Sequence, residues 1–155
     1  GNSVLLVDCD MRNPSIHKKF KISNAAGTAE LLLRKKLFEE VANKYNENLT
    51  IITAGKIPPN PSEMLASRAM TAFIEEMKKE FKYIILDTPP LQAVTDAQVL
   101  STKADGVLLV VRAGSTKREM VLNSVDLIKK VQGKVIGTVL NGVENKKNNY
   151  YYYGE

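Results

Sequence analysis

Residues 3–12 read SVLLVDCDMR, and the fold that we expect follows from the pattern of these ten residues. Four consecutive apolar residues precede Asp8, so a strand here would be apolar on both of its faces. Strands of that kind are typical of a parallel sheet that helices cover on both sides. We therefore expect a buried parallel strand that ends at a carboxylate.

Further short apolar runs follow at regular intervals, and segments with helical patterns lie between them. These runs are LTIIT (49–53), YIILD (83–87), GVLLVV (106–111) and KVIGTVLN (134–141). Alternating strands and helices predict an α/β fold with a mostly parallel sheet sandwiched between helices and right-handed crossovers. We expect one domain over residues 1–143, for which the motifs below predict nucleotide binding. Residues 144–155 have no apolar periodicity and are predicted to form a flexible tail.

The helical patterns also carry start and stop signals. Residues 62–81 place apolar side chains near one helix face, with Ser62 as a candidate N-cap. In the segment 115–133, Thr116 and Glu119 fit a capping box, and Gly133 is placed to follow the helix end as the C′ residue. Shorter helices are expected around 28–36 and 95–103.

The composition is that of a soluble globular domain, with 44% hydrophobic and 25% charged residues in 155. No run approaches the roughly 18 apolar residues of a membrane helix, and no secretory signal is present. The single cysteine, Cys9, cannot form an internal disulfide, which favours a reducing cytosol. Its place within the apolar stretch favours a packing role over a reactive one.

The chain carries a net charge of +5 and has a pI near 9.2. Its basic residues form small clusters, such as HKKFK (17–21) and RKK (34–36). These clusters are typical of solvated element ends, and the alternative is a face held near anionic lipid headgroups or another polyanion. Net charge alone does not indicate DNA binding.

Acidic residues follow two of the predicted strands. Asp8, Asp10 and Arg12 stand at a spacing of two, so in an extended chain all three side chains would point the same way. Asp87 ends the run YIIL as the aspartate of a Walker B strand does. Ligands of open α/β sheets bind beyond the carboxyl ends of the strands. Carboxylates there suit Mg²⁺, and an arginine suits phosphate.

These motifs together resemble the catalytic domain of the bacterial tyrosine kinases (BY-kinases) that govern capsule and exopolysaccharide synthesis. VLLVDCDMRNP resembles their Walker A′ motif, YIILDTPP their Walker B motif, and TAGKIPPNPSEML the loop and helix start between the two. VTDAQVLSTKADGVLLVVRAGST, VIGTVLNGV and the terminal tyrosines continue the pattern, so the resemblance spans essentially the whole chain. It implies a P-loop NTPase fold of the ParA/MinD group, unlike that of eukaryotic protein kinases.

The resemblance also implies an activity and its residues. ATP with Mg²⁺ would bind at the carboxyl edge of the sheet, and the γ-phosphoryl group would pass to a tyrosine in the tail of a neighbouring copy. Asp8 and Asp10 are the implied catalytic carboxylates, one of them a base for the phenol, and Asp10 and Asp87 the implied metal ligands. The implied nucleotide-binding residues are Asp8, Asp10, Arg12, Asp87, Arg112 and Asn141. A phenol, with a pKa of about 10, needs such a carboxylate nearby to react near neutral pH.

The resemblance extends to partners and location. It implies a cytoplasmic protein peripheral to the inner face of the cell membrane, activated by a membrane-anchored adaptor of the polysaccharide co-polymerase type. It further implies a homo-oligomeric ring and a cognate tyrosine phosphatase, and no nucleic acid is expected.

One motif of the family, the phosphate-binding loop G-x-x-x-x-G-K-[ST], does not occur in the 155 residues. Gly27-Thr28, AGK (54–56) and AGST (113–116) each lack part of it. Because this loop precedes the Walker A′ strand in the family, we expect the first strand, P-loop and helix to be absent from this chain. We then expect either exposed apolar surface or a rearranged sheet, together with weak nucleotide binding and no kinase activity from this chain alone. The chain would be either a fragment of an active kinase, which is our hypothesis, or a derivative without kinase activity.

The chain ends in NNYYYYGE (148–155). In a strand, adjacent phenols would point alternately to opposite faces, so half of them would be exposed, which disfavours a buried strand. Two interpretations remain, a sticky terminal patch and a set of phosphoacceptors. With the motifs above, the expected phosphoacceptors are Tyr150, Tyr151, Tyr152 and Tyr153. Two other functions stay open: a positioning ATPase of the ParA/MinD type, and a non-catalytic phosphotyrosine scaffold.

Overall fold

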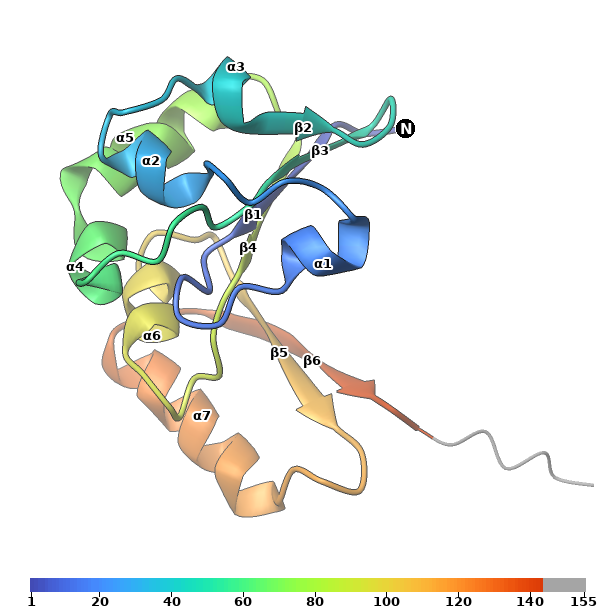
Figure 1. Cartoon of the computed structure of the whole chain (residues 1–155). Coiled ribbons are helices and arrows are strands. Elements are labelled where there is room, and N and C mark those ends of the chain that lie inside the picture. The colour runs from blue at the N-terminus through green and yellow to red at the C-terminus, as the bar shows by residue number, and fades with distance from the viewer. Residues whose placement is uncertain (144–155) are drawn as a thin grey trace, which may run out of the picture.

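The computed structural model describes residues 1–143 and confirms the predicted α/β fold (Figure 1). Each predicted strand forms with bounds within one residue of those expected. The strands are β1 (Val4–Asp8), β2 (Ala42–Lys44), β3 (Leu49–Ile52), β4 (Tyr83–Asp87), β5 (Val107–Arg112) and β6 (Val135–Asn141). Only the short strand β2 among these was not predicted.

Four of the strands form one sheet in the order β2-β3-β1-β4. The strand that holds SVLLVD, β1, lies inside this sheet and pairs in parallel with both β3 and β4. Leu5 and Val7, which share one face of the strand, are fully buried, whereas Val4 and Leu6 on the opposite face are half-buried, so only one face is completely covered. The edge strand β2 is antiparallel to β3, so the sheet is mostly but not wholly parallel.

The other two strands, β5 and β6, form a separate parallel pair with a register shift between Val107 and Leu108. Within residues 1–143 no strand joins β4 to β5, so each of these strands has an unpaired edge. Apolar side chains on both are exposed, with relative exposures of 52% for Ile85, 55% for Leu108 and 62% for Val110. The expectation of exposed apolar surface is therefore confirmed on these two strands, and β6 also exposes Ile136 (62%) and Leu140 (60%).

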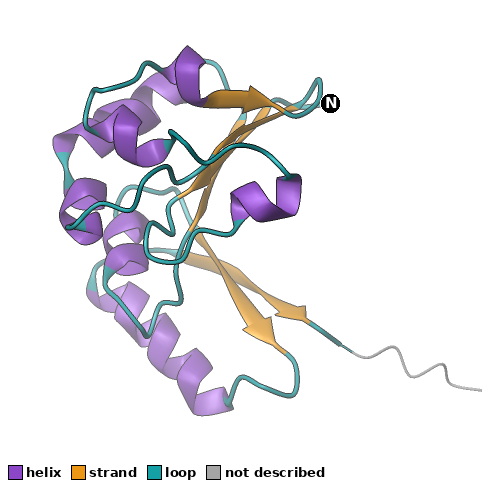
Figure 2. Ribbon diagram, in the orientation of Figure 1, coloured by secondary structure: helices purple, strands orange, loops and turns teal. Residues whose placement is uncertain are grey.

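The helices lie on both sides of the strands (Figures 1 and 2). One side carries α2 (Thr28–Leu32), α4 (Pro61–Ala66), α5 (Arg68–Met77), α6 (Asp96–Ser101) and α7 (Arg118–Lys130), whereas α1 (Ile16–Phe20) lies on the other. The short helix α3 (Phe38–Val41) leads directly into β2. In the described part of the chain no helix is long and apolar enough to span a bilayer.

The helix predicted over residues 62–81 is in fact two helices, α4 and α5. The break falls at Ser67, whose backbone is extended (φ −63°, ψ 160°). Its side-chain oxygen accepts a hydrogen bond from the Met70 amide and caps α5. Asn60 precedes α4 and Pro61 opens it, so the assignment of Ser62 as the N-cap was wrong. Proline suits the first turn because its missing N–H would have no partner there.

The ends of α7 also differ from the prediction. Lys117 is the N-cap residue, and Thr116 uses its Oγ1 to accept a hydrogen bond from the Arg112 amide instead of capping the helix. At the other end Gln132 adopts the left-handed conformation, with φ of 62°. The Gly133 amide bonds the Ile128 carbonyl at 2.9 Å. This is a Schellman motif in which Gly133 stands one residue later than expected.

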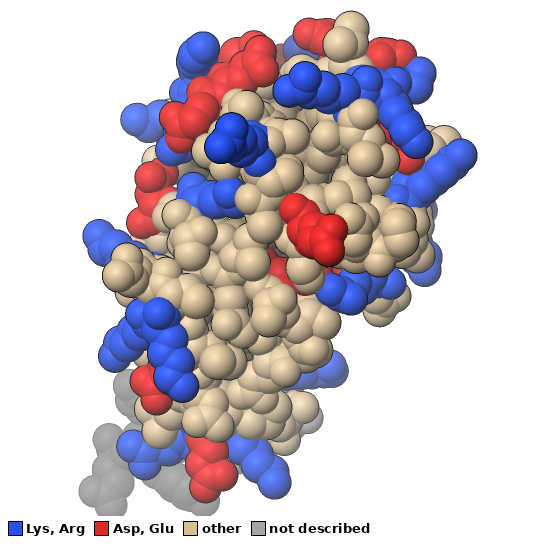
Figure 3. Space-filling view, turned by 90° about the vertical axis from the view of Figure 1, so that its left-hand side faces the viewer, with Lys and Arg blue, Asp and Glu red and all other residues tan. Residues whose placement is uncertain are grey.

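The main core lies between the four-stranded sheet and the helices. It includes Leu5, Val7, Cys9, Met11, Ala29, Ile52, Leu65, Met70, Phe73 and Ile74. Cys9 is fully buried, in agreement with its predicted packing role. Figure 3 shows the helical side, where Lys and Arg lie mainly around the margins and no continuous basic patch forms.

Candidate functional site

The site is built on the carboxyl ends of β1 and β4. Asp8 and Asp87 are register partners in these neighbouring parallel strands. The pairing continues one residue further, where the Cys9 amide donates to the Asp87 carbonyl at 2.8 Å. The two predicted carboxylates are thus brought together at one edge of the sheet, as the strand-end argument required.

The Asp8 side chain is fully buried and organises the loop that follows β1. Its Oδ1 accepts a hydrogen bond from the Asp10 amide at 3.1 Å, and its Oδ2 accepts one from the Ile16 amide at 3.3 Å. The Asp8 carbonyl accepts a further bond from Thr28 Oγ1 at 3.0 Å. Asp8 therefore connects its own strand to the starts of α1 and α2.

Asp10 is half-buried and directs the next turn. Its Oδ1 accepts hydrogen bonds from the Arg12 amide at 3.2 Å and the Asn13 amide at 3.0 Å. On either side of it, Cys9 and Met11 are fully buried in the core. The carboxylate is thereby held by its own loop and by the packing of its neighbours.

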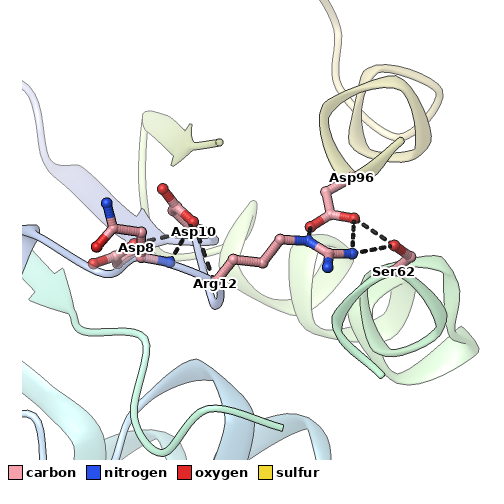
Figure 4. Close-up of polar contacts among 6 residues, drawn as sticks. Asp8, Asp10, Arg12, Ser62 and Asp96 are labelled. Atoms are coloured by element: carbon pink, nitrogen blue, oxygen red, sulfur yellow. Dashed lines mark hydrogen bonds and ion pairs between the residues drawn. The ribbon is translucent and has the colours of Figure 1, made fainter. Parts of the chain in front are cut away.

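The expectation that Asp8, Asp10 and Arg12 point the same way was wrong. The last bond of the ladder is that of the Cys9 amide, and from Asp10 onward the amides bond carboxylate oxygens of the loop instead, so the chain does not stay extended. Figure 4 shows the Arg12 side chain running away from both aspartates toward two helices.

Arg12 instead ends in a pair with Asp96, the first residue of α6. Its Nε lies 2.9 Å from Asp96 Oδ2, and its Nη2 lies 3.1 Å from Asp96 Oδ1. Nη2 also donates to Ser62 Oγ at 3.0 Å, and Ser62 in turn hydrogen-bonds Asp96 Oδ1. Asp96 is fully buried, whereas 41% of the Arg12 side chain is exposed.

Electrostatics separates these carboxyl groups into two kinds. Burial raises the pKa of Asp8, and the charges of Asp87 and Asp10 raise it further against the lowering effect of its amide hydrogen bonds. Burial also raises the pKa of Asp87, with Asp10 adding to the rise and Lys19 opposing it. Burial acts in the same direction on Asp96, but the hydrogen bonds from Arg12 and Ser62 outweigh it and lower the pKa of that group. The pKa values of Asp8 and Asp87 are therefore raised, chiefly by burial, whereas that of Asp96 is lowered by its partners.

Among residues 1–143 no three His, Cys, Asp or Glu side chains are grouped closely enough to hold a metal ion by themselves. Mg²⁺ in nucleotide sites needs no such cage, because it is held by one or two carboxylates together with water and substrate phosphates. The half-buried Asp10 and Asp87 provide oxygen ligands of the required type at one edge. The donor set therefore fits a magnesium ion shared with a phosphate ligand.

The other two predicted nucleotide contacts lie on the second sheet. Arg112 and Asn141 end β5 and β6 and are register partners, both exposed. The Ala113 amide donates to the Asn141 carbonyl at 2.8 Å, which closes this end of the pair. The structure thus brings Arg112 and Asn141 together, and among residues 1–143 no hydrogen bond joins either of them to Asp8, Asp10 or Asp87. Tyr150, Tyr151, Tyr152 and Tyr153 lie outside the described residues.

Sequence reasoning missed three residues near the site. Asp96 is the first residue of α6, in the segment VTDAQVL, and no role was predicted for it from the sequence. Ser62 was assigned to a cap and instead contacts Asp96. Lys19, in the basic cluster on α1, lies close enough to Asp87 for its charge to lower that pKa. No signal in one sequence could link Arg12 to a residue 84 positions away.

Comparison with known proteins agrees with this geometry. The family model described as an AAA domain matches residues 1–140. The tyrosine-protein kinase YwqD of Bacillus subtilis is 38% identical over 99% of this chain, and the putative tyrosine-protein kinase CapB of Staphylococcus aureus is 38% identical over all of it. The solved kinase domain of the Escherichia coli tyrosine kinase ETK matches 99% of the chain with 33% identity and a TM-score of 0.90.

The fold and the paired strand-end carboxylates define a P-loop NTPase-like domain. A plasmid partition protein of Borrelia burgdorferi has the same fold (TM-score 0.71, covering 94% of this chain and 71% of that one), but at 18% identity that likeness concerns the fold alone. The chain belongs to the bacterial tyrosine-protein kinases, as the resemblance of its motifs predicted. It spans 66% of the length of YwqD, 69% of CapB and 61% of the ETK kinase domain.

Proposed function

We propose that this chain is part of an ATP-dependent, autophosphorylating protein-tyrosine kinase and supplies its metal-binding carboxylates and its acceptor tyrosines. The kinase would regulate capsule or exopolysaccharide synthesis and export. The observation that carries the proposal is the register pairing of Asp8 with Asp87, with Asp10 two residues beyond. Like-charged carboxylates at the carboxyl edge of a parallel sheet are an unstable arrangement unless a cation or proton joins them.

In this proposal Asp10 and Asp87 hold Mg²⁺ together with the phosphates of ATP. The ion, when bound, would neutralise charge on the transferred phosphoryl group. Arg112 and Asn141 are exposed at the ends of β5 and β6 and would contact the nucleotide from the second sheet. The motif G-x-x-x-x-G-K-[ST] is not among the 155 residues, so we attribute no phosphate-cradling role to this chain.

The proton of the attacking phenol would pass to the pair Asp8 and Asp10. Asp8 has the raised pKa that suits a proton acceptor, but it is fully buried and its two oxygens already accept amide hydrogen bonds. Asp10 is half-buried, and the bonds that its carboxylate accepts from Arg12 and Asn13 both use Oδ1. We therefore assign first contact with the phenol to Asp10 and the orientation of Asp10 to Asp8.

The acceptors in this proposal are Tyr150, Tyr151, Tyr152 and Tyr153 of a neighbouring copy in a ring-shaped homo-oligomer. Each phosphate adds about −1.5 to −2 charges, so a fully modified tail changes by roughly −6 to −8. Repulsion from the acidic edge formed by Asp8, Asp10 and Asp87 would then eject the tail and loosen the assembly. A cognate phosphatase would reset it, and a membrane-anchored adaptor at the inner face of the cell membrane would activate it.

The test uses the whole natural protein that carries this sequence, incubated with Mg²⁺ and γ-labelled ATP. We expect label on the terminal tyrosines by mass spectrometry, and a loss of rate of at least about 100-fold in Asp10→Asn and Asp87→Asn, as is typical when a positioned catalytic carboxylate is removed. Asp105→Asn, at a carboxylate whose side chain is 95% exposed, is the matched control and should keep full activity.

Two results would overturn the proposal. One is undiminished labelling after all four tyrosines are changed to Phe, which would place the acceptors elsewhere. The other is full activity in both aspartate variants. A protein that is phosphorylated only by another kinase would support the scaffold alternative. The positioning-ATPase alternative is not favoured, because the relatives at 38% identity are named as tyrosine-protein kinases.

A further inference from the structure

We propose that Arg12 is a positioning residue, clamped by Asp96 and Ser62, that holds the Asp10 turn in place beside Asp87, and that it does not bind phosphate. This inference rests on the proposed function, since it concerns how the same acidic edge is kept in a working geometry. It replaces the expectation, drawn from the spacing of Asp8, Asp10 and Arg12, that the guanidinium faces the ligand.

The clamp joins three separate parts of the chain. Arg12 lies in the loop after β1, Ser62 lies in α4, and Asp96 opens α6 (Figure 4). The guanidinium meets both oxygens of one carboxylate through Nε and Nη2, at 2.9 and 3.1 Å. Such a two-point contact fixes the plane of the guanidinium as well as its position.

The clamp continues through the backbone into the acidic edge. The amide of Arg12 donates to Asp10 Oδ1 at 3.2 Å, and the amide of Asp10 donates to Asp8 Oδ1 at 3.1 Å. Holding the Arg12 side chain therefore holds the residue whose N–H orients the Asp10 carboxylate. A continuous chain of hydrogen bonds thus runs from Asp96 through Arg12 to Asp10 and Asp8.

The other end of the clamp leads back to Asp87. Residues 88–95 connect β4 to α6, so Asp87 and Asp96 are the two ends of one loop. Asp8 and Asp87 already meet across β1 and β4. The contact of Arg12 with Asp96 ties the exit loops of these two strands together a second time, beyond the sheet. The strand pairing and the ion pair together restrict the distance between Asp10 and Asp87 more than two independent loops would.

Burial explains why Arg12 stays in the clamp. Asp96 is fully buried, and its remaining side-chain partner is Ser62. If Arg12 swung out toward a phosphate, it would leave an ionised carboxylate in the interior without a counter-charge, which is strongly unfavourable. Arg12 is therefore expected to stay paired with Asp96, whereas the exposed Arg112 has no carboxylate partner among the described residues.

The first test needs no catalysis and uses the whole natural protein that carries this sequence. In Arg12→Gln and Asp96→Asn, hydrogen exchange at the amides of Arg12 and Asn13, followed by ¹H–¹⁵N NMR, should accelerate at least about tenfold as the turn opens locally. Arg68→Gln, an exposed arginine at the start of α5, is the matched control and should leave both amides unchanged. Unchanged exchange in Asp96→Asn would overturn the clamp. If that variant fails to fold, Ser62→Ala removes one contact to Asp96 and should give a smaller change in the same direction.

The second test measures kcat and KM for Mg·ATP in the whole natural protein. If Arg12 is a positioning residue, Arg12→Gln should lower kcat by roughly 10- to 100-fold. Asp96→Asn should lower kcat by the same factor, and the double variant should have a kcat no lower than either single variant. Arg12→Lys should not rescue, because an ammonium cannot make the two-point contact. A phosphate-binding Arg12 predicts the opposite: a raised KM in Arg12→Gln, rescue by Lys, and a harmless Asp96→Asn.

These tests separate the two proposals. If the wild-type protein shows no tyrosine phosphorylation, the proposed function fails, and the exchange measurements still decide whether the clamp exists. If phosphorylation is normal and depends on Asp10 and Asp87 but not on Asp96, the proposed function stands and the positioning role of Arg12 fails.

Discussion

Asp8 and Asp87 are register partners where β1 and β4 end, and the pKa of each carboxyl is raised chiefly by burial. A raised pKa in the folded state means that the folded protein holds these protons more tightly than the unfolded chain. The stability contributed by the protonated groups is therefore fully present below the unfolded pKa and is lost as the pH rises through the folded pKa. At neutral pH the two carboxylates oppose folding.

Asp87→Asn should consequently make the protein more stable at pH 7. We expect a gain of about 1 kcal/mol in the free energy of unfolding, which is typical for relieving a strained functional site. The gain should shrink toward zero as the pH falls toward the ordinary carboxyl range, because the wild-type group is then protonated too. Urea unfolding of both proteins at several pH values measures this, with exposed Asp105→Asn as the control. A loss of stability at pH 7 would contradict it.

A divalent cation should occupy this edge even without nucleotide. We expect Mn²⁺ at millimolar concentration to broaden the amide resonances of Asp8, Asp10 and Asp87 in the NMR spectrum, and EDTA to restore them. Two half-buried carboxylates without phosphate ligands make a weak site, so the effect should be lost in Asp10→Asn. Broadening centred on another part of the chain would show that the acidic edge is not the metal site.

The sheet and this acidic edge could be predicted because both depend on local pattern. β1 and β4 are short apolar runs that end in aspartate, and parallel strands bring their carboxyl ends to one edge whatever the rest of the chain does. β2 was missed because its residues, ANK, carry neither apolar alternation nor β-branched side chains. It forms because β3 offers a free edge to pair with.

The direction of Arg12 could not be predicted for a different reason. Spacing of two fixes a common face only while the backbone is extended, and here Asp8 and Asp10 accept amides of their own loop and turn the chain. The partner that then receives the guanidinium, Asp96, is close only in the folded protein. A tertiary contact between two polar residues produces no periodic pattern in the sequence, so it cannot be predicted from one sequence.

The break between α4 and α5 gives a test of local stability. The apolar pattern runs through Ser67 without interruption, but its Oγ accepts a hydrogen bond from the Met70 amide at 3.3 Å and starts a new helix. Ser67→Ala should lower the free energy of unfolding by about 1 kcal/mol, the usual effect of losing an N-cap. Chemical denaturation measures it, with exposed Ser115→Ala as the neutral control. Equal stability of the two variants would show that the cap does not contribute.

The thiol of Cys9 lies between the two catalytic candidates Asp8 and Asp10, yet it should be unreactive. Its side chain is fully buried, and burial raises its pKa well above the ordinary value, with the charges of Asp8 and Asp87 adding to the rise. Because only the thiolate reacts, alkylation should require opening of the core.

We expect iodoacetamide at pH 8 to label the native chain at least about 1,000-fold more slowly than the chain in urea, as the folding equilibrium dictates. Asp8→Asn should not increase the native rate beyond its effect on global stability, since burial is the larger cause. Fast labelling of the native protein would mean that the loop after β1 opens on its own, and the fixed geometry of the acidic edge would then have to be abandoned.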